Sequence, residues 1–197
     1  MKRMLCLILV LMLCCLFGAG QAGGVIPNLR DTPTPEPAAQ VFSFRGGIRW
    51  DMSREQVKTQ ESVQLVEQNR EDWSILVPVS RVEVSKFTAD LVYIFYNDRL
   101  KVITYDFGAG GSDEDYQYLT SALDYVYGTH EEPAAADIKG VMDQIYPGYY
   151  SEESLLNRRG WKAGSDTLIY LYYYSEKAWA ILYVNAGSVP NYVTTGL

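Results

Sequence analysis

Residues 91–107, LVYIFYNDRLKVITYDF, decide the fold of this chain. Two runs of β-branched and aromatic residues flank Asn97 and Asp98, a pair that tolerates the positive φ angles of a tight turn. The pattern predicts a β-hairpin in which Tyr96 pairs with Arg99, whereas a three-residue loop would exchange the faces of one strand. Because side chains alternate along a strand, each face receives its own set of residues. The expected core face holds Leu91, Tyr93, Phe95, Leu100 and Val102, and the partly wet face holds Val92, Ile94, Ile103, Tyr105, Arg99 and Lys101.

Three segments carry helical patterns. Ser53, followed three residues later by Gln56, forms a capping box that predicts a short helix at residues 54–61. Apolar and aromatic residues recur at helical spacing over residues 113–127, which predicts the main helix, and a glycine follows as its stop. A shorter amphipathic pattern predicts a third helix at residues 138–146.

A second hairpin is predicted near the end of the chain, at residues 166–174 and 178–184 around a three-residue loop. Every second residue along the latter half of the first strand is a tyrosine, and aromatic residues also recur on its partner. This aromatic row consists of Tyr170, Tyr172, Tyr174, Trp179 and Tyr183. Tyrosine and tryptophan dominate interface hot spots, so the row is the candidate binding surface. The alternative is that helices cover the row and make it core.

The remaining strand signal lies at residues 73–84, where Pro78 indicates a sheet edge or a strand start. Residues 61–72 are polar and carry no clear pattern, and residues 151–159 are expected to form one more turn or a loop. The sequence therefore predicts one α+β domain at residues 41–188, built on a single antiparallel sheet of about five strands with two or three helices packed on one face.

Residues 1–22 have the features of a secretory signal peptide: basic residues, an apolar run, and small residues that permit cleavage after Ala22 or Gly20. The apolar run is shorter than the roughly 20 residues that span a bilayer, so no membrane span is expected in the mature chain, with a retained anchor as the alternative. Residues 23–40 are proline-rich, which predicts an extended linker, or a recognition ligand for another domain. Residues 189–197 are expected to form a disordered tail.

All three cysteines, Cys6, Cys14 and Cys15, lie inside the predicted signal peptide. The mature chain would therefore contain no disulfide, no cysteine nucleophile and no cysteine-ligated metal. An exported protein without cysteines is typical of a bacterial envelope, because eukaryotic secreted domains more often use disulfides. A lipid anchor is not expected, since Leu13 precedes Cys14 where a lipoprotein signal requires a small residue.

The charge balance argues against nucleic acid as a partner. The formal net charge is −7 and the sequence pI is about 4.8, and removal of the signal peptide would take away two more positive charges. An acidic chain repels the phosphate backbone, and no basic cluster extends beyond Arg158 and Arg159. The 16 tyrosines against 6 phenylalanines instead suit sheets with a wet face and surfaces that bind.

Residues 44–57, FRGGIRWDMSREQV, resemble the opening "F-R-G-I-x-W-G-x-S-x-E-x-V" of small exported bacterial proteins grouped with the β-lactamase-inhibitor-protein-like fold. Residues 116–128 are similar to that group's later "Y-x-x-L-x-x-x-L-x-x-x-Y-G" motif. Gly47 is an insertion in the first motif, and Asp51 replaces its glycine. The resemblance implies helices packed on an antiparallel sheet and a habit of binding, and it transfers no catalytic residue.

Two further segments have some of the features of a functional site. Residues 108–115 place glycines between a strand and a helix, but the spacing of a phosphate-binding loop is absent and the acidic residues at the helix start would repel an anion. The expected role is a turn in which Ser112 and Asp115 cap the helix, and the acidic spacing does not match a calcium loop. His130, the only histidine, is interpreted as a solvated loop residue because nearby Glu131 and Glu132 would not converge on one metal.

The sequence thus favours an exported, non-catalytic binding or envelope-associated module that uses an aromatic sheet surface and needs neither cofactor nor metal. The expected partner is another envelope or secreted protein. A hydrolase with a carboxylate-based site is one alternative, although no serine motif or carboxylate spacing singles it out. A structural component of envelope assembly is the other alternative, with the same fold and a different partner.

Overall fold

Eight strands form a single antiparallel sheet in the computed structural model, which describes residues 42–70, 73–175 and 178–187. The order across the sheet is β1-β2-β4-β5-β8-β7-β6, and β3 pairs with β4 off this path. The strands are β1 (Leu65–Arg70), β2 (Trp73–Pro78), β3 (Val82–Val84), β4 (Phe87–Tyr96), β5 (Arg99–Ala109), β6 (Leu156–Ala163), β7 (Thr167–Tyr173) and β8 (Ala178–Asn185). The predicted signal peptide, linker and tail lie outside the described residues. The α+β class and the single sheet are confirmed, but the expected strand count of about five was too low.

The strands that sequence patterns missed are the two edges of the sheet, β1 and β6. An edge strand pairs on one side only, so polar side chains are tolerated and the alternation of apolar residues is weak. β6 shows this directly, because Leu156 is exposed while Trp161 on the same strand is buried. The segment predicted as one strand at residues 73–84 is divided in two, because β2 ends at Pro78.

The central hairpin of β4 and β5 has the predicted turn. Tyr96 pairs with Arg99, and the two turn residues between them both have positive φ angles. An irregularity between Ile94 and Phe95 then shifts the register, so that Val102 lies opposite Ile94. The predicted faces are therefore wrong beyond this bulge: Val102 joins the face of Ile94, and Ile103 joins the face of Tyr93. A bulge inserts one residue and so exchanges the faces of everything that follows it.

Three helices accompany the sheet, together with short 3-10 turns at Arg45–Gly47 and Glu152–Ser154. They are α1 (Arg54–Gln60), α2 (Asp113–Tyr127) and α3 (Ala135–Ile145). The predicted capping boxes at Ser53 and Ser112 are both present, each satisfying backbone N–H groups that a helix start leaves unpaired. None of the helices in the described part of the chain is long and apolar enough to cross a membrane.

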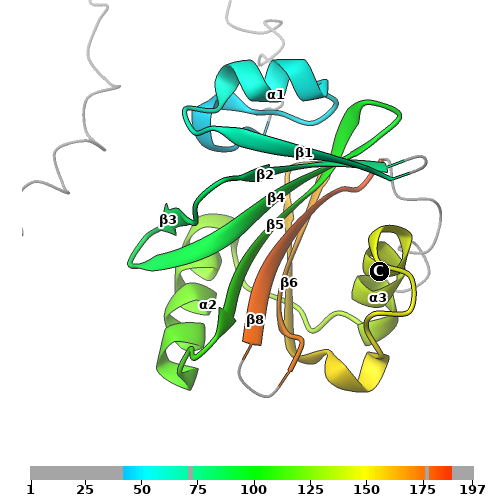
Figure 1. The fold of residues 1–197 in the computed structure, drawn as a ribbon. Helices are drawn as coiled ribbons and strands as arrows, with labels where there is room; N and C mark the ends of the chain where they lie inside the picture. Colours follow the sequence, from blue (N-terminus) through cyan, green and yellow to red (C-terminus); the bar gives the residue numbers. More distant parts are fainter. Residues whose placement is uncertain (1–41, 71–72, 176–177, 188–197) are drawn as a thin grey trace, which may run out of the picture. The chain divides into compact units, whose positions relative to one another are not determined.

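The helices cover both faces of the sheet, which corrects the expectation of one covered face. α1 and α2 pack on one side, and α3 packs on the other, as Figure 1 shows for α2 and α3. The central strands explain this arrangement, since every residue of β7 is buried and such a strand needs cover on both sides. The core under α3 includes Ile94, Val102, Ile138, Val141, Met142, Ile145, Tyr170, Tyr172 and Leu182, and the core under α2 includes Phe107, Tyr116, Leu119, Leu123, Trp161, Tyr173, Trp179 and Ile181.

Candidate ligand-binding pocket

The floor of the candidate site is one row of residues across four neighbouring strands on the α3 face of the sheet. Asp90 of β4 pairs with Asp106 of β5, Asp106 pairs with Ala180 of β8, and Ala180 pairs with Tyr172 of β7. Residues paired across strands share a face, so all four side chains stand on the same side. Ala180 contributes only a methyl group between two larger neighbours, which leaves a hollow in the middle of the row.

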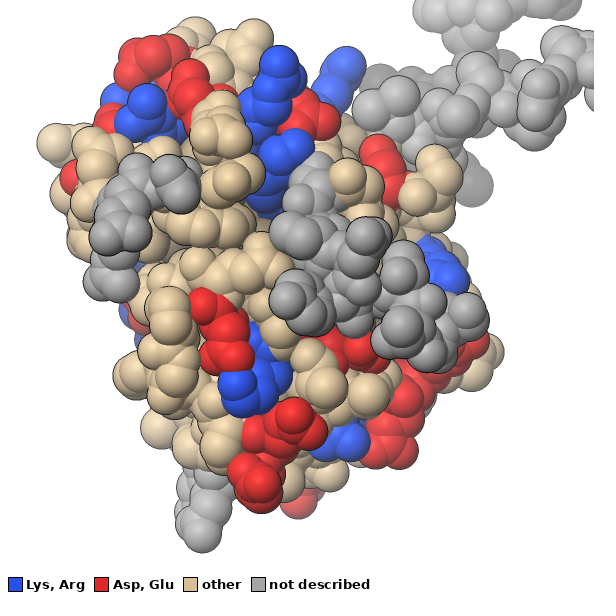
Figure 2. Space-filling view, turned by 90° about the vertical axis from the view of Figure 1, so that its right-hand side faces the viewer, with Lys and Arg blue, Asp and Glu red and all other residues tan. Residues whose placement is uncertain are grey.

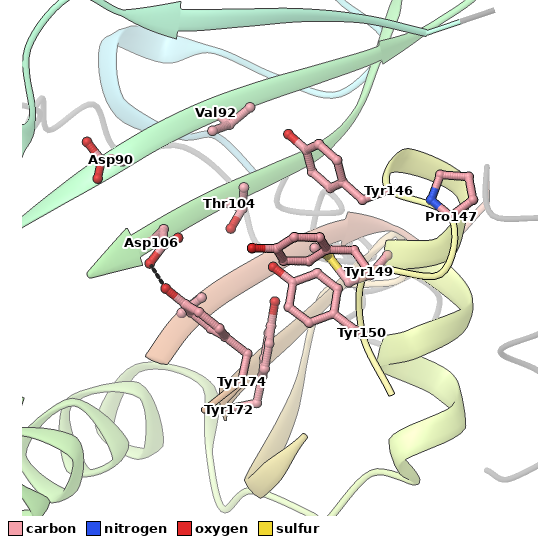
Figure 3. A pocket seen from close by; sticks show the side chains of 12 residues that line it. Asp90, Val92, Thr104, Asp106, Tyr146, Pro147, Tyr149, Tyr150, Tyr172 and Tyr174 are labelled. Carbon is pink, nitrogen blue, oxygen red and sulfur yellow. Dashed lines mark hydrogen bonds between the residues drawn. The ribbon is translucent and has the colours of Figure 1, made fainter. Parts of the chain in front are cut away.

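Helix α3 ends before it reaches this row, and the chain that follows it forms the wall. The helix stops at Ile145, and Pro147 and Gly148 turn the chain, as the sequence predicted. The turn brings Tyr149 and Tyr150 over the floor, where they point toward Tyr172 and Tyr174 (Figure 3). The wall therefore comes from a loop and the floor from the sheet.

The resulting cavity has a volume of about 570 Å³, within the range of small-molecule sites. Tyrosine supplies most of the aromatic lining, and the polar lining is carboxylate and hydroxyl. None of the described residues that line the cavity is lysine or arginine. The lining consists of Asp90, Val92, Thr104, Asp106, Met142, Tyr146, Pro147, Tyr149, Tyr150, Tyr172, Tyr174 and Ala180.

The tyrosine rings in the pocket meet edge to face. The ring centroids of Tyr149 and Tyr150 are 4.9 Å apart at 77°, and those of Tyr150 and Tyr174 are 5.9 Å apart at 83°. Such T-shaped pairs are a favourable aromatic geometry. Tyr149 is 74% exposed although it belongs to this cluster, so it forms the open rim of the pocket.

Asp106 is the best-anchored polar group of the site. Its Oδ1 accepts one hydrogen bond from the hydroxyl of Tyr174 and another from the backbone N–H of Gly108, both at 2.8 Å (Figure 3). Its Oδ2 accepts no hydrogen bond from the described residues. Asp90 has a different neighbour, because its Oδ2 lies 3.5 Å from Nε of Arg81. One carboxylate oxygen of Asp106 is thus available to a ligand.

Burial makes ionisation of Tyr150 and Tyr174 still less favourable than that of an exposed tyrosine. It raises the pKa of Tyr150 and of Tyr174 well above the ordinary value, because a phenolate is poorly solvated there. The hydrogen bond to Asp106 and the negative charge of that carboxylate raise the pKa of Tyr174 further. The rings therefore stay neutral.

The predicted aromatic row does not form one surface. Tyr172 and Tyr174 line the pocket, while Tyr170 lies on the same face buried under α3. Trp179 and Tyr183 lie on the opposite face of the sheet, where Trp179 is buried and stacked on a phenylalanine of β5. The pairing register explains the separation, since Tyr172 lies opposite Ala180 and not opposite Trp179.

Sequence reasoning missed Tyr149, Tyr150, Asp90 and Asp106. A usable signal existed in residues 146–150, YPGYY, where three tyrosines surround a Pro-Gly helix stop. No comparable local signal marks the aspartates, because a carboxylate at the end of a strand is also typical of a solvated turn.

His130 is held more firmly than a solvated loop residue. Its Nδ1 lies 2.9 Å from Oδ1 of Asp124, and the indole N–H of Trp161 donates to the same oxygen at 2.9 Å. Burial acts to raise the pKa of Asp124, but the hydrogen bonds from His130 and Trp161 outweigh it and lower that pKa. No hydroxyl of the described residues is hydrogen-bonded to the imidazole, so the pair has no nucleophile in place.

Two other segments have clear structural roles. Ser112 and Asp115 cap α2 as predicted, and Asp115 also pairs with Lys86 at 2.7 Å. Among the residues that the structure describes, no three His, Cys, Asp or Glu side chains come together as metal ligands. The pocket under the α3 turn gathers five tyrosines, against two in a second cavity that Tyr170 helps to line, so it is the stronger candidate site.

Comparison with known proteins finds no protein family, no curated protein and no solved structure that matches this chain. The resemblance to exported proteins of the β-lactamase-inhibitor-protein-like fold therefore stays a prediction from the sequence. Function has to be inferred from the pocket itself.

Proposed function

We propose that this protein is an exported, non-catalytic binding module whose ligand enters the tyrosine-lined pocket. The observation that carries the proposal is the convergence of Tyr149, Tyr150, Tyr172 and Tyr174 around a cavity of about 570 Å³. Tyrosines that served only as core would close on one another, whereas these leave a cavity with an exposed rim. Export rests on the signal-peptide features of residues 1–22, and the expected source of the ligand is another envelope or secreted protein or a small molecule outside the cytoplasm.

The polar groups of the pocket suit binding better than bond cleavage. Asp106 accepts hydrogen bonds from Tyr174 and Gly108, so it is held as a fixed acceptor in the lining of the cavity. Ligand sites commonly combine an apolar lining with a few positioned polar groups of this kind. A structural role in envelope assembly differs from this proposal only in that its partner would be a permanent neighbour.

A carboxylate-based glycoside hydrolase is the second candidate, because Asp90 and Asp106 are directly opposed on one face. Retaining enzymes place their two carboxyl groups about 5 Å apart, with one attacking and the other protonating the leaving group. The ion pair of Asp90 with Arg81 and the two hydrogen bonds on Asp106 oppose these roles. If the protein hydrolyses a saccharide, and both Asp90→Asn and Asp106→Asn abolish this activity, the result would favour the enzyme.

The test is a ligand screen read out at the tyrosines. Protein with isotopically labelled tyrosine rings is titrated with saccharides, amino acids, amines, nucleosides and short peptides while ring resonances are followed by NMR. We expect one class to shift the signals of Tyr149, Tyr150 and Tyr174. The shifts should disappear in Tyr149→Ala and persist in Tyr125→Ala, whose ring is 92% exposed on α2. A screen in which no class moves the pocket signals contradicts the proposal.

A further inference from the structure

The charges on the pocket floor favour one class of ligand. This inference rests on the proposed function, because it concerns the same pocket. Asp90 and Asp106 are cross-strand partners, and like charges directly opposite each other destabilise a sheet. Arg81 lies 3.5 Å from a carboxylate oxygen of Asp90 and also donates to the backbone carbonyls of Asp106 and Phe107. The side-chain Oδ2 of Asp106 has no hydrogen-bond donor among the described residues. The hollow above Ala180 therefore has a carboxylate oxygen on its floor that a cation would satisfy.

The walls of the pocket also favour a positively charged ligand. Neutral aromatic rings attract a cation within about 6 Å of the ring centroid, and tyrosine is one of the better rings for this contact. Tyr149, Tyr150 and Tyr174 stand around one space on the same side of the sheet (Figure 3). An anion would find no lysine or arginine among the described lining residues.

Charged side chains on the face that carries α3 add an electrostatic field that acts on a ligand over a longer range. Figure 2 views this face: acidic side chains gather over its lower part with fewer basic ones among them, and basic side chains gather over its upper part. A surface lined mainly by one sign of charge raises the local concentration of the opposite ion and speeds its association. A positively charged ligand is therefore drawn toward the lower part of this face.

We infer that the pocket binds an organic ammonium ion, with the cationic nitrogen against Oδ2 of Asp106 and its carbon substituents against the tyrosine rings. A divalent metal ion fits less well, because the described residues bring no third carboxylate or histidine to the site. A cavity of about 570 Å³ also exceeds the needs of a bare ion. The ammonium group belongs either to a free amine or to a lysine side chain of a partner.

The closing experiment compares matched probes by calorimetric titration of the purified protein. Choline is compared with 3,3-dimethylbutan-1-ol, which has the same shape without the charge, and spermidine serves as a primary-amine probe. A lysine-containing peptide is compared with its acetylated form to separate a partner side chain from a free amine. We expect one of the charged probes to bind and its neutral counterpart to bind about tenfold more weakly or worse.

Asp106→Asn is the decisive variant, because the asparagine Oδ1 still accepts the hydrogen bonds from Tyr174 and Gly108 while the charge is removed. It should weaken the charged probe by about tenfold or more. Glu114→Gln removes an exposed charge from α2 and should leave the affinity unchanged.

The outcomes separate this inference from the proposed function. Equal weakening by Asp106→Asn and Glu114→Gln would show non-specific charge attraction and overturn the inference. A neutral ligand that shifts the pocket tyrosines and tolerates Asp106→Asn would also overturn it, while the binding module would stand. If neither charged nor neutral probes reach the pocket tyrosines, both proposals fail.

Discussion

The two faces of the sheet are both rich in aromatic residues, and yet the part of one face that lies under α2, the sealed face, is closely packed, while the other face holds a pocket. A further cavity on the first side lies beside Arg45 and Tyr105, and no residue of α2 lines it. On the α2 face, Trp179 stacks on Phe107 with centroids 4.1 Å apart, and Tyr116 stacks on Tyr173 at 4.6 Å. On the α3 face, the tyrosines meet edge to face, and one directs its hydroxyl at a carboxylate. Aromatic content alone therefore does not distinguish core from binding site.

The length and placement of the covering helix account for the difference. α2 has fifteen residues and lays Tyr116, Leu119 and Leu123 on the sheet, so the strands beneath it are covered. α3 has eleven residues and ends at Ile145, before the row that contains Asp106. Beyond that stop only a turn covers the sheet, and a turn fills space less completely than a helix packed along its length. The comparison teaches that a shortened helix over an aromatic sheet is one route to a ligand site.

The largest expected effect on stability comes from removing a buried side chain from the sealed face. Trp179→Ala removes a ring that is 1% exposed and should lower the free energy of unfolding by about 3–5 kcal/mol, through lost burial and the cavity left behind. Chemical denaturation followed by circular dichroism measures this change. Tyr125→Ala on the exposed side of α2 is the matched control and should stay within about 0.5 kcal/mol. A loss below about 1 kcal/mol for Trp179→Ala would contradict a tightly packed α2 face.

The next effect tests how closely the sealed face is packed. A Cβ at Gly111 would lie 2.0 Å from Nε1 of Trp179, so Gly111→Ala should displace the indole and cost about 1–3 kcal/mol. Denaturation midpoints and the wavelength of tryptophan emission report the change. Gly187→Ala, where the nearest atom is 3.6 Å away, should be nearly neutral. Equal stabilities for the two variants would show that the indole moves aside freely.

A smaller effect concerns the Asp124–His130 contact at the end of α2. The pKa of Asp124 is lower in the folded than in the unfolded chain, so the ionised carboxylate favours folding. This contribution is present above the unfolded value of about 3.9 and is lost as the pH falls through the lower folded value. Asp124→Asn should therefore destabilise the protein by less than about 1 kcal/mol at pH 7, because the carboxylate is partly exposed.

Thermal denaturation from pH 7 to pH 2 checks this dependence. The gap between wild type and Asp124→Asn should close as the pH falls below about 4. A gap that stays constant over the whole range would mean that the charge of Asp124 makes no contribution and that only its shape matters.

The smallest effect on stability belongs to the pocket rim. Tyr149→Ala should change the free energy of unfolding by no more than about 0.5 kcal/mol, because the ring is 74% exposed, while it abolishes the ligand-induced shifts of the pocket tyrosines. Thermal denaturation and the NMR titration together separate these two properties. A decrease of about 2 kcal/mol or more in the free energy of unfolding would show that Tyr149 is part of the core. The two faces would then no longer differ in this respect.

Predictions from the sequence succeeded where the signal was local. The turn at Asn97 and Asp98 and the capping boxes at Ser53 and Ser112 each depend on residues a few positions apart. The helix over residues 113–127 was predicted with the bounds that it has, because its apolar stripe repeats over several turns. Edge strands were missed because one side of an edge strand has no partner to impose a pattern.

The candidate site was predicted only in part, at Tyr172 and Tyr174. Sequence alternation placed these two tyrosines on one face correctly. It also grouped them wrongly with Trp179, because alternation within one strand does not show which residues of the paired strand lie opposite. The pairing register of β7 and β8 decides that. Asp106 and Tyr149, separated by more than forty positions, meet because β5 and the turn after α3 fold onto the same end of the sheet.

The sequence by itself determined the turn at Asn97 and Asp98, the capped starts of α1 and α2, and the alternation of side chains, since each depends on backbone preferences within a few residues. The third helix starts at Ala135, three residues before its predicted start. The tertiary structure alone decided the sheet order, the bulge that exchanged the faces of β5, and the placement of helices on both sides. These choices depend on which distant surfaces bury one another, and many distant pairings are compatible with the same local pattern. The pocket belongs to this second group, because the strands of its floor and the turn of its wall come from separate parts of the chain.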